Sequence, residues 1–501
     1  MFAQLAQDVE FVRPAIDWHA AAPELTLLGF GALVTLMDII WLERGRRLTS
    51  AVASIALLVT MIPILTLAID GTDRSMFNGA FIVDDYALVM KGLFVLAGYV
   101  VILLSTNYVA EGDYWENEYY GLLLSSVLGM ILMASARDLI TIFVALELLS
   151  IPAYMLATWR KRDLKSNEAG LKYYLMGVFA SAIMLYGMSL LYGGAGSTLL
   201  VDINAAISGA SSPAAVIVLG VIFVIIGFAI KVSAFPFHTW APDTYEGAPT
   251  PITAFLSVAS KAAGFVALMN LLFVGFYGRD DVYEPLIWIL AAASMTVGNL
   301  IALRQTNIVR MLAYSGVAQA GYMLAPLAVA SQVPDKALSA TVTYLVIYAA
   351  MNLGAFAVVM AVARKTRSAE IDSFRGLFHY APGLTVAMTI FLFSLAGIPP
   401  LGGWFAKFRV MEAVIEAETG AGVVLGVFVA VNSVIALYYY ARIGLGMWAE
   451  DAPDGDTTPV KVPASLASAL AITVAVTLVF GVLPGIVGDL TEVSLLAGIG
   501  G

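Results

Sequence analysis

The sequence predicts an all-α polytopic membrane protein with about 14 transmembrane helices. Of its 501 residues, 60% are hydrophobic and only 12% are charged. An ordinary soluble domain carries roughly 25% charged residues, so this chain has too few charges to cover a water-facing surface of its size. The composition therefore excludes a cytosolic globular enzyme, a disordered tail and a secreted disulfide scaffold.

Long apolar segments recur along the whole chain. One helical crossing needs about 20 apolar residues, whereas a membrane barrel would show alternating segments of about ten residues, which do not occur here. The predicted crossings cover residues 24–42, 49–69, 84–105, 118–136, 138–158, 167–193, 214–244, 249–276, 284–303, 307–330, 337–363, 382–417, 421–448 and 463–489.

Basic residues in the connecting loops predict the orientation. The loops after segments 1, 5, 9, 11 and 13 carry 15 lysines and arginines, and the opposite side carries 5. Cytoplasmic loops are enriched in basic residues, while acidic residues have little influence. We therefore expect the loops 160–165 and 364–375 inside the cell, and both termini in the periplasm.

The chain has no cysteine and three histidines. It therefore cannot hold thiolate-ligated iron–sulfur clusters, zinc–cysteine sites or disulfides of its own. Only His238 lies beside the middle of an apolar segment, which argues against a bis-histidine haem. We expect no cofactor and no metal on this chain, so that any redox chemistry belongs to another chain.

Charged residues inside the predicted helices are the main candidates for function. Glu147 lies nine residues from Asp138 and twelve from Trp159, which places it roughly 14–18 Å from either membrane surface. Each central charge costs at least about 2.5–3.5 kcal/mol, so Glu147 and four lysines together oppose insertion by more than about 12 kcal/mol. Six basic residues lie within segments: Lys91, Lys172, Lys231, Lys261, Lys407 and Arg409.

Two of these lysines lie next to predicted breaks in a helix. Pro236 follows Lys231 by about one turn, and Pro399 and Pro400 precede Lys407 inside a segment too long for one straight crossing. Broken helices beside intramembrane charges are typical of transporters. The breaks fall in segments 7 and 12, and this odd spacing predicts two halves of inverted topology.

Each candidate also has a simpler interpretation. Glu147 could be a protonated acid bonded to a neighbouring helix, and Lys231 could be a snorkelling lysine at a structural kink. Lys172 lies only a few residues into its segment, so snorkelling is a serious alternative there. His238 could change protonation near neutral pH or simply bond the backbone at a helix end. Lys91 and Arg409 are expected to snorkel or to pair locally.

A long motif resembles the antiporter-like membrane subunits of respiratory complex I. The string KVSAFPFHTWAPDTYEGAPTP over residues 231–251, which continues to Lys261, carries two of the lysines. The strings EAGLKYYLMG at 168–177 and GGWFAK at 402–407 are similar to subunit N of that family. The resemblance spans essentially all predicted segments.

The resemblance implies a fold and a set of roles. It implies two inverted five-helix repeats at residues 118–276 and 284–448, flanked by 1–117 and 449–501. It implies that Glu147 pairs with Lys231, that Lys261 and Lys407 continue a lateral proton relay, and that Lys172 lies near the glutamate. NADH, FMN, iron–sulfur clusters and quinone would belong to partner subunits, with K-like and M-like neighbours in a bacterial inner membrane. Nucleic acid is not an expected partner.

Three rival functions stay open at this point. A subunit of a multisubunit sodium/proton antiporter shares the same core. A solute transporter would need Asn and Gln ligands in a wide cavity, and the scarcity of these residues within the segments argues against it. A pure scaffold would not need so many buried charges.

Overall fold

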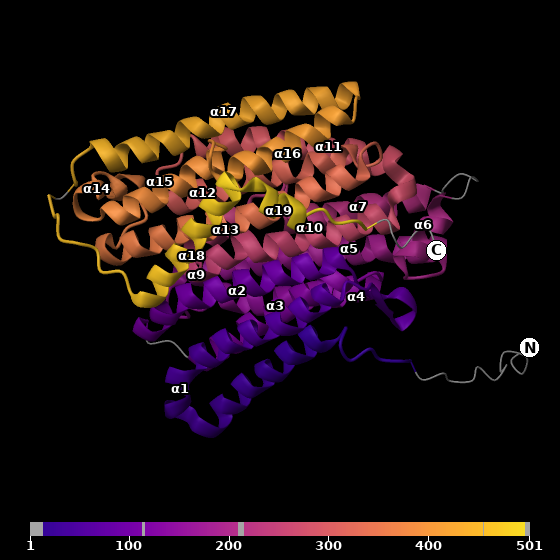
Figure 1. Ribbon diagram of the computed structural model, residues 1–501, viewed down its shortest axis with the longest axis horizontal. Helices are drawn as coiled ribbons and strands as arrows, with labels where there is room; N and C mark the ends of the chain where they lie inside the picture. Colours follow the sequence, from indigo (N-terminus) through magenta and orange to yellow (C-terminus); the bar gives the residue numbers. More distant parts are fainter. Residues whose placement is uncertain (1–13, 113–115, 209–214, 454, 496–501) are drawn as a thin grey trace, which may run out of the picture.

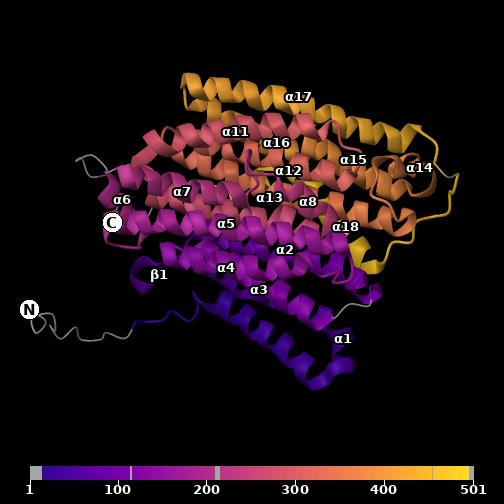
Figure 2. The same cartoon turned by 180° about the vertical axis from the view of Figure 1, so that it is seen from behind.

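The computed structural model describes residues 14–112, 116–208, 215–453 and 455–495 of the chain. Helices lie side by side in a stack that begins with α1 at one edge and ends with α17 at the other (Figure 1). The reverse view shows the same order, with α5, α7, α8 and α12 on its near side (Figure 2). The multi-pass helical fold predicted from composition is confirmed, with ten helices long and apolar enough to cross a membrane in the described ranges.

The elements follow the predicted segments closely. They are α1 (Ala22–Asp70), β1 (Arg74–Met76), β2 (Phe81–Val83), α2 (Asp85–Glu111), α3 (Glu116–Ser135), α4 (Leu139–Ala157), α5 (Leu164–Ala195), α6 (Leu200–Ser208), α7 (Ala215–Lys231), α8 (Trp240–Gly247), α9 (Thr250–Phe255), α10 (Lys261–Asn270), α11 (Asp280–Ala302), α12 (Ile308–Leu324), α13 (Pro334–Thr366), α14 (Leu377–Tyr380), α15 (Pro382–Ala396), α16 (Gly402–Glu416), α17 (Gly420–Ala449), α18 (Ala464–Val482) and α19 (Pro484–Leu490). Three shorter apolar helices add to the ten spans, and the total of 14 crossings stays a prediction.

The first helix contains two of the predicted crossings. A straight helix of 49 residues would be about 73 Å long. Yet His19, just before α1, has its Nε2 atom 2.9 Å from the hydroxyl of Thr66 near the other end. Asp17 likewise forms an ion pair of 2.6 Å with Arg74, just beyond the helix. The element therefore folds back on itself, as Figure 1 shows.

Polar side chains define where several helices begin. Asp84, Asp138, Asp163, Asn307 and Thr419 each accept a hydrogen bond from a backbone N–H in the first turn of the helix that follows. Such caps satisfy amide groups that have no partner inside the helix. The small antiparallel β1–β2 hairpin and α6 were not predicted, because both are too short to give an apolar span.

The helix that carries Lys261 lies at the centre of the molecule. The segment Thr250–Gly275 is buried throughout its most apolar window, and α13 is buried almost as completely. The segment is not a regular α-helix, since π-helical turns at Leu256–Ser260 and Leu271–Gly275 flank α10. By contrast, only about a third of the corresponding window is buried in α17 and α18. The candidate site is therefore built around the most enclosed helices.

Both predicted breaks are present. The seventh crossing stops at Lys231 and resumes at Trp240, whose indole N–H donates to the carbonyl of Ile230 across the gap. The twelfth stops at Ala396 and resumes at Gly402. Discontinuous helices at these two positions are therefore confirmed, and each break lies next to an intramembrane lysine.

Candidate functional site

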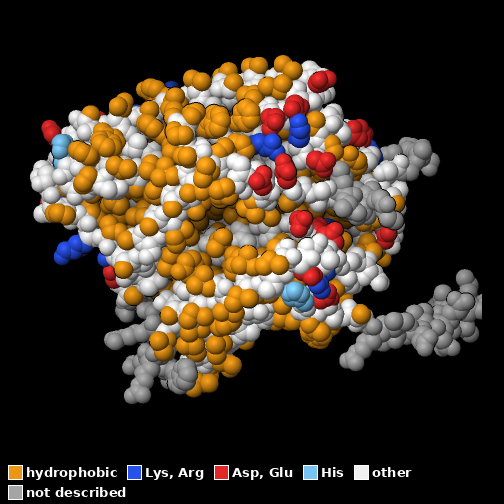
Figure 3. Space-filling view, viewed as in Figure 1, with side chains coloured by type: hydrophobic (Ala, Val, Ile, Leu, Met, Phe, Trp, Pro, Cys, Tyr) orange, Lys and Arg blue, Asp and Glu red, His pale blue; other side chains and the backbone are white. Residues whose placement is uncertain are grey.

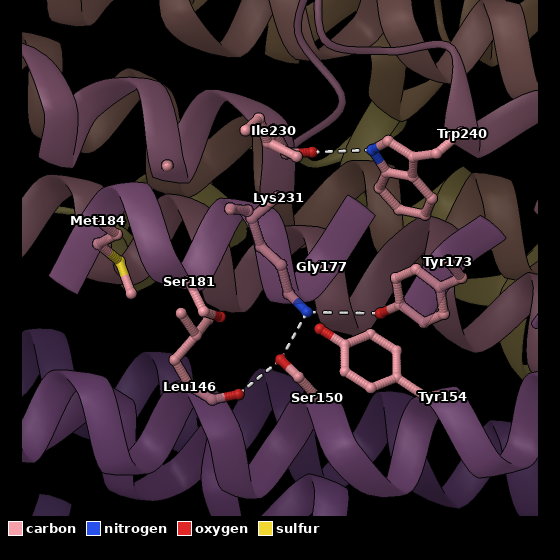
Figure 4. A pocket seen from close by; sticks show the side chains of 12 residues that line it. Leu146, Ser150, Tyr154, Tyr173, Gly177, Ser181, Met184, Ile230, Lys231 and Trp240 are labelled. Carbon is pink, nitrogen blue, oxygen red and sulfur yellow. Dashed lines mark hydrogen bonds between the residues drawn. The ribbon is translucent and has the colours of Figure 1, made fainter. Parts of the chain in front are cut away.

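Lys231 is buried among hydroxyl groups at the end of α7. Its ammonium donates to Ser150 Oγ at 2.8 Å and to Tyr173 Oη at 3.4 Å (Figure 4). The Ser150 hydroxyl donates its own hydrogen to the carbonyl of Leu146 at 2.5 Å, so it can only accept from the lysine. The rings of Tyr173 and Tyr154 lie 5.6 and 6.0 Å from the ammonium and add cation–π attraction. This surrounding stabilises the positive charge without any carboxylate.

Glu147 and Lys231 are not in contact in this structure, so the pair that the resemblance implies stays a prediction. The carboxylate of Glu147 accepts instead from the hydroxyl of Ser181 on α5, at 2.5 Å. Ser150 lies three residues further along α4 and faces the lysine, whereas Glu147 is half-buried on the neighbouring side of the helix. Among the described ion pairs, none joins the two residues. The structure thus shows them separated, each with a hydroxyl partner.

A small cavity lies between these groups. It has a volume of about 20 Å³ and is lined by Lys231, Ser150, Tyr173 and Ser181, among others. A volume of about 10–15 Å³ is enough for one water molecule, which needs two to four polar partners. The cavity therefore has the volume for one water between the lysine and the serine that bonds Glu147.

Lys261 points across to α12 from the middle of the molecule. It is 2% exposed, and its ammonium donates to the carbonyl of Gly316 at 2.6 Å. A Cβ at Gly316 would lie 3.1 Å from this nitrogen and 3.3 Å from the hydroxyl of Tyr348. Glycine at this position therefore keeps the carbonyl accessible to the lysine. On the other side, Gly264 lets the stem of Lys231 pack closely against α10.

Lys407 bonds back across the second break. Its ammonium donates to the carbonyl of Ala396, the last residue of α15, at 2.9 Å and lies 4.6 Å from the centre of the Tyr322 ring. Gly397 follows with φ +89°, and a Cβ there would lie 2.8 Å from Cδ of the lysine. The break thus supplies a carbonyl that no helix turn uses and the space for the side chain to reach it.

Gln319 joins the surroundings of Lys261 and Lys407. It lies about one turn beyond Gly316 on α12, and its amide donates to the carbonyl of Leu395 at 3.3 Å, next to the carbonyl that Lys407 uses. Its oxygen accepts from Tyr344, and its amide also reaches the hydroxyl of Tyr440 at 3.4 Å. Polar groups therefore continue from the second lysine to the third.

Lys172 and His238 occupy other positions. The resemblance implied that Lys172 lies near Glu147. In the structure Lys172 lies nine residues, or roughly 13 Å, before Ser181, the partner of Glu147 on α5. It pairs with Asp243 at 2.7 Å in a charged cluster beside a cavity of about 150 Å³. His238 is buried near Tyr314, and its Nδ1 has no hydrogen-bond partner in the described part of the chain.

The remaining intramembrane cations are paired. Arg409 bonds Glu412 at 2.8 Å, which confirms the expected local pairing. Lys91 is fully buried and does not snorkel, since it forms an ion pair of 2.7 Å with Glu24 on α1. Sequence reasoning missed Glu24 because it lies at the edge of the first predicted segment.

One further expectation is wrong. Amide side chains are not scarce inside the protein, because five of them are buried: Asn270, Asn299, Gln319, Asn352 and Asn432. They bond carbonyls and hydroxyls of neighbouring helices, so they serve packing and the polar network. Amide content therefore does not separate this chain from a solute transporter. Among the described residues, no group of three or more acidic or histidine side chains could hold a metal ion.

Lys231, Lys261 and Lys407 share one feature that the buried Lys91 lacks. Each is between 2% and 8% exposed, and each donates to a neutral oxygen: a hydroxyl for Lys231, and backbone carbonyls for Lys261 and Lys407. A neutral acceptor leaves the amine free to lose its proton, whereas a carboxylate partner would hold the charge in place. Fold and site together define a membrane protein of the antiporter-like class.

Comparison with known proteins gives the family. The family model for the transmembrane region of NADH:quinone oxidoreductase and Mrp antiporters matches residues 136–433. A subunit N of NADH-quinone oxidoreductase from Heliobacterium modesticaldum is 42% identical over 85% of this chain and 88% of its own length. A chain of respiratory complex I from Thermus thermophilus is similar at 30% identity, with a TM-score of 0.78 over 94% of this chain and all of that one. The chain belongs to the NADH-quinone oxidoreductase subunit N family.

A chain of the Mrp complex from Dietzia sp. DQ12-45-1b shares the fold, with a TM-score of 0.83 at 21% identity. It covers 95% of this chain and 97% of its own length. At this identity the likeness concerns the fold alone.

Proposed function

We propose that this chain translocates protons as subunit N in the membrane arm of a bacterial NADH:quinone oxidoreductase. The observation that carries the proposal is the series Lys231, Lys261 and Lys407, three buried lysines on neutral acceptors joined by polar groups. An uncompensated charge in a membrane is costly and is retained where it serves transport. A lysine with a neutral acceptor can carry a proton and release it.

Glu147 controls the first lysine in this proposal. When the carboxylate turns from Ser181 toward the cavity, it pairs with Lys231 and holds the ammonium protonated. When it turns back, as in the structure, Lys231 keeps only neutral partners, which stabilise its charge less than the carboxylate would. The proton then moves toward Lys261 and Lys407. Moving one charge against 100 mV costs about 2.3 kcal/mol, an energy that quinone chemistry on partner subunits must supply.

The proposal extends to assembly and orientation. NADH, FMN, iron–sulfur clusters and quinone would be bound by partner subunits, and K-like and M-like membrane subunits would be the neighbours. Loops predicted to share the cytoplasmic side do meet in the structure, as Arg364 with Glu111 and Arg310 with Glu246 show. These contacts support the placement of these loops on the same side of the membrane. The excess of basic residues in the loops indicates that this side is the cytoplasm. The two inverted repeats, 118–276 and 284–448, are part of the same proposal.

A subunit of a multisubunit sodium/proton antiporter is the second candidate. The shared fold with the Mrp chain favours it, as does a family model that covers both groups. The relatives of similar length point to subunit N instead. Purification decides between the two. A large complex with NADH:quinone activity supports the first proposal, whereas isolation with antiporter subunits and no NADH oxidation contradicts it.

The relay is tested in the assembled complex. Lys231→Ala should lower quinone reduction and proton pumping together in reconstituted vesicles. Lys231→Arg should also fail, because arginine stays charged and cannot release a proton. Lys161→Ala, at an exposed loop lysine, is the matched control and should pump normally. Normal pumping by either Lys231 variant would reduce this lysine to a structural cation.

A further inference from the structure

A deep apolar groove opens on the face formed by α1, α2, α13, α18 and α19. Its volume is about 600 Å³, and its walls are mainly aliphatic side chains such as Leu65, Leu96, Leu353 and Val476. Figure 3 shows this face, where hydrophobic side chains surround the hollow and charged side chains, acidic and basic, gather toward one side of it. The groove shares no lining residue with the cavity at Lys231, so it needs a separate explanation.

Water is a poor occupant of this groove. A water molecule needs two to four polar partners, and waters in this groove would lack such partners along the aliphatic walls. The hydroxyl of Thr473 already donates within its own helix, to the carbonyl of Ala469. An apolar space that opens toward a membrane is filled by hydrocarbon, which has no hydrogen bonds to lose.

The dimensions fit one lipid chain. On α2 the lining runs from Asp85 to Val100, which is roughly 22 Å along the helix axis. Half of a bilayer's hydrocarbon core is about 15 Å thick. An extended acyl chain can therefore lie in the groove along its whole length.

The charged end of the groove indicates the headgroup. Asp85, Asp489 and Glu492 line the groove, and all three are exposed. None of the three carboxylates has an ion pair or a side-chain hydrogen bond in the described part of the chain, and the lining contains no lysine, arginine or histidine.

We propose that this groove binds one phospholipid whose headgroup carries an amine, with an acyl chain along α2 and the ammonium at the three carboxylates. An ammonium is attracted to these carboxylates, whereas a purely anionic headgroup is repelled. The site is independent of the proton relay and would persist if the relay proposal failed.

The test uses the whole complex in membranes and a phospholipid with a photoreactive group in the acyl chain. An ethanolamine headgroup and a glycerol headgroup are compared. We expect adducts on α2, α13 and α18, with the ethanolamine lipid favoured about threefold or more, as exposed ion pairs allow. Neutralising the three carboxylates (Asp85→Asn, Asp489→Asn and Glu492→Gln) should remove the preference and leave the acyl labelling.

Gly92 offers a variant that fills the groove. It lines the groove, and a Cβ there meets no atom within 4 Å. Gly92→Leu and Gly92→Phe should reduce labelling by roughly five- to thirtyfold, the factor that one or two kcal/mol represents. Gly31→Phe is the matched control, because Gly31 also faces open space but does not line the groove. Equal labelling by both headgroups, unchanged labelling in both Gly92 variants, or no labelling because a partner subunit covers the groove would each overturn the proposal.

Discussion

Ser150→Ala is the sharpest test of how the site controls Lys231. The substitution removes the 2.8 Å hydrogen bond to the ammonium and leaves only Tyr173 at 3.4 Å. A hydrogen bond to a charged group contributes about 1.5–3 kcal/mol. Because the Ser150 hydrogen is already donated to Leu146, the hydroxyl oxygen faces the lysine as an acceptor. Its removal should therefore impair proton transfer through Lys231.

The expected size follows from that energy. A loss of 1.5–3 kcal/mol corresponds to roughly a ten- to 150-fold change in an equilibrium constant. Pumping through Lys231 should consequently be much lower in the variant. The assay is proton uptake by vesicles that contain the complex, measured with quinone reduction across a range of pH.

A matched control separates this effect from general damage. Ser126 is also a buried serine next to α4, and its hydroxyl donates to the carbonyl of Leu149 without contacting a lysine. Ser126→Ala should leave pumping unchanged even if it lowers stability. If Ser150→Ala and Ser126→Ala both pump as the unmodified protein does, Ser150 does not support proton transfer through Lys231 and the reasoning is refuted.

Three other outcomes are expected. Lys91→Met should destabilise the complex by about 3–5 kcal/mol, because it leaves Glu24 buried and unpaired, and adding Glu24→Gln should recover most of the melting temperature. Gly397→Ala should impair pumping more than Gly71→Ala, since both positions have positive φ but only the first would press on a lysine stem; equal pumping in the two variants would contradict this. A cysteine at Ser368 should react only with reagents from the cytoplasmic side, and labelling from outside would reverse the proposed orientation.

The positions of the helices could be predicted from the sequence, because each membrane crossing consists almost entirely of apolar residues. The predicted 138–158 and 167–193 differ from α4 and α5 by only a few residues. Proline and glycine also marked both breaks, since these residues interrupt a helix wherever they fall. The lysines were found for the same reason, as a charge stands out against an apolar background.

The partners of those lysines could not be predicted in the same way. Lys261 bonds the backbone carbonyl of Gly316. Because every residue has such a carbonyl, the sequence does not indicate which one a lysine will bond. The position of Ser150, three residues beyond Glu147, was visible in the sequence. That spacing did not show which side of the helix faces Lys231. The separation of Glu147 from Lys231 depends on side-chain rotation, which composition and periodicity do not describe.

The π-helical turn at Leu256–Ser260 has a mechanical consequence for Lys261, the residue that directly follows it. A π turn closes its hydrogen bonds five residues apart, so it stores one residue more than an α turn. If that extra residue passed beyond Lys261 toward the π turn at Leu271–Gly275, the lysine would rotate about the helix axis by about 100°. Nearly all backbone hydrogen bonds would reform. Such a shift would move the ammonium of Lys261 away from Gly316 without any hinge or loop.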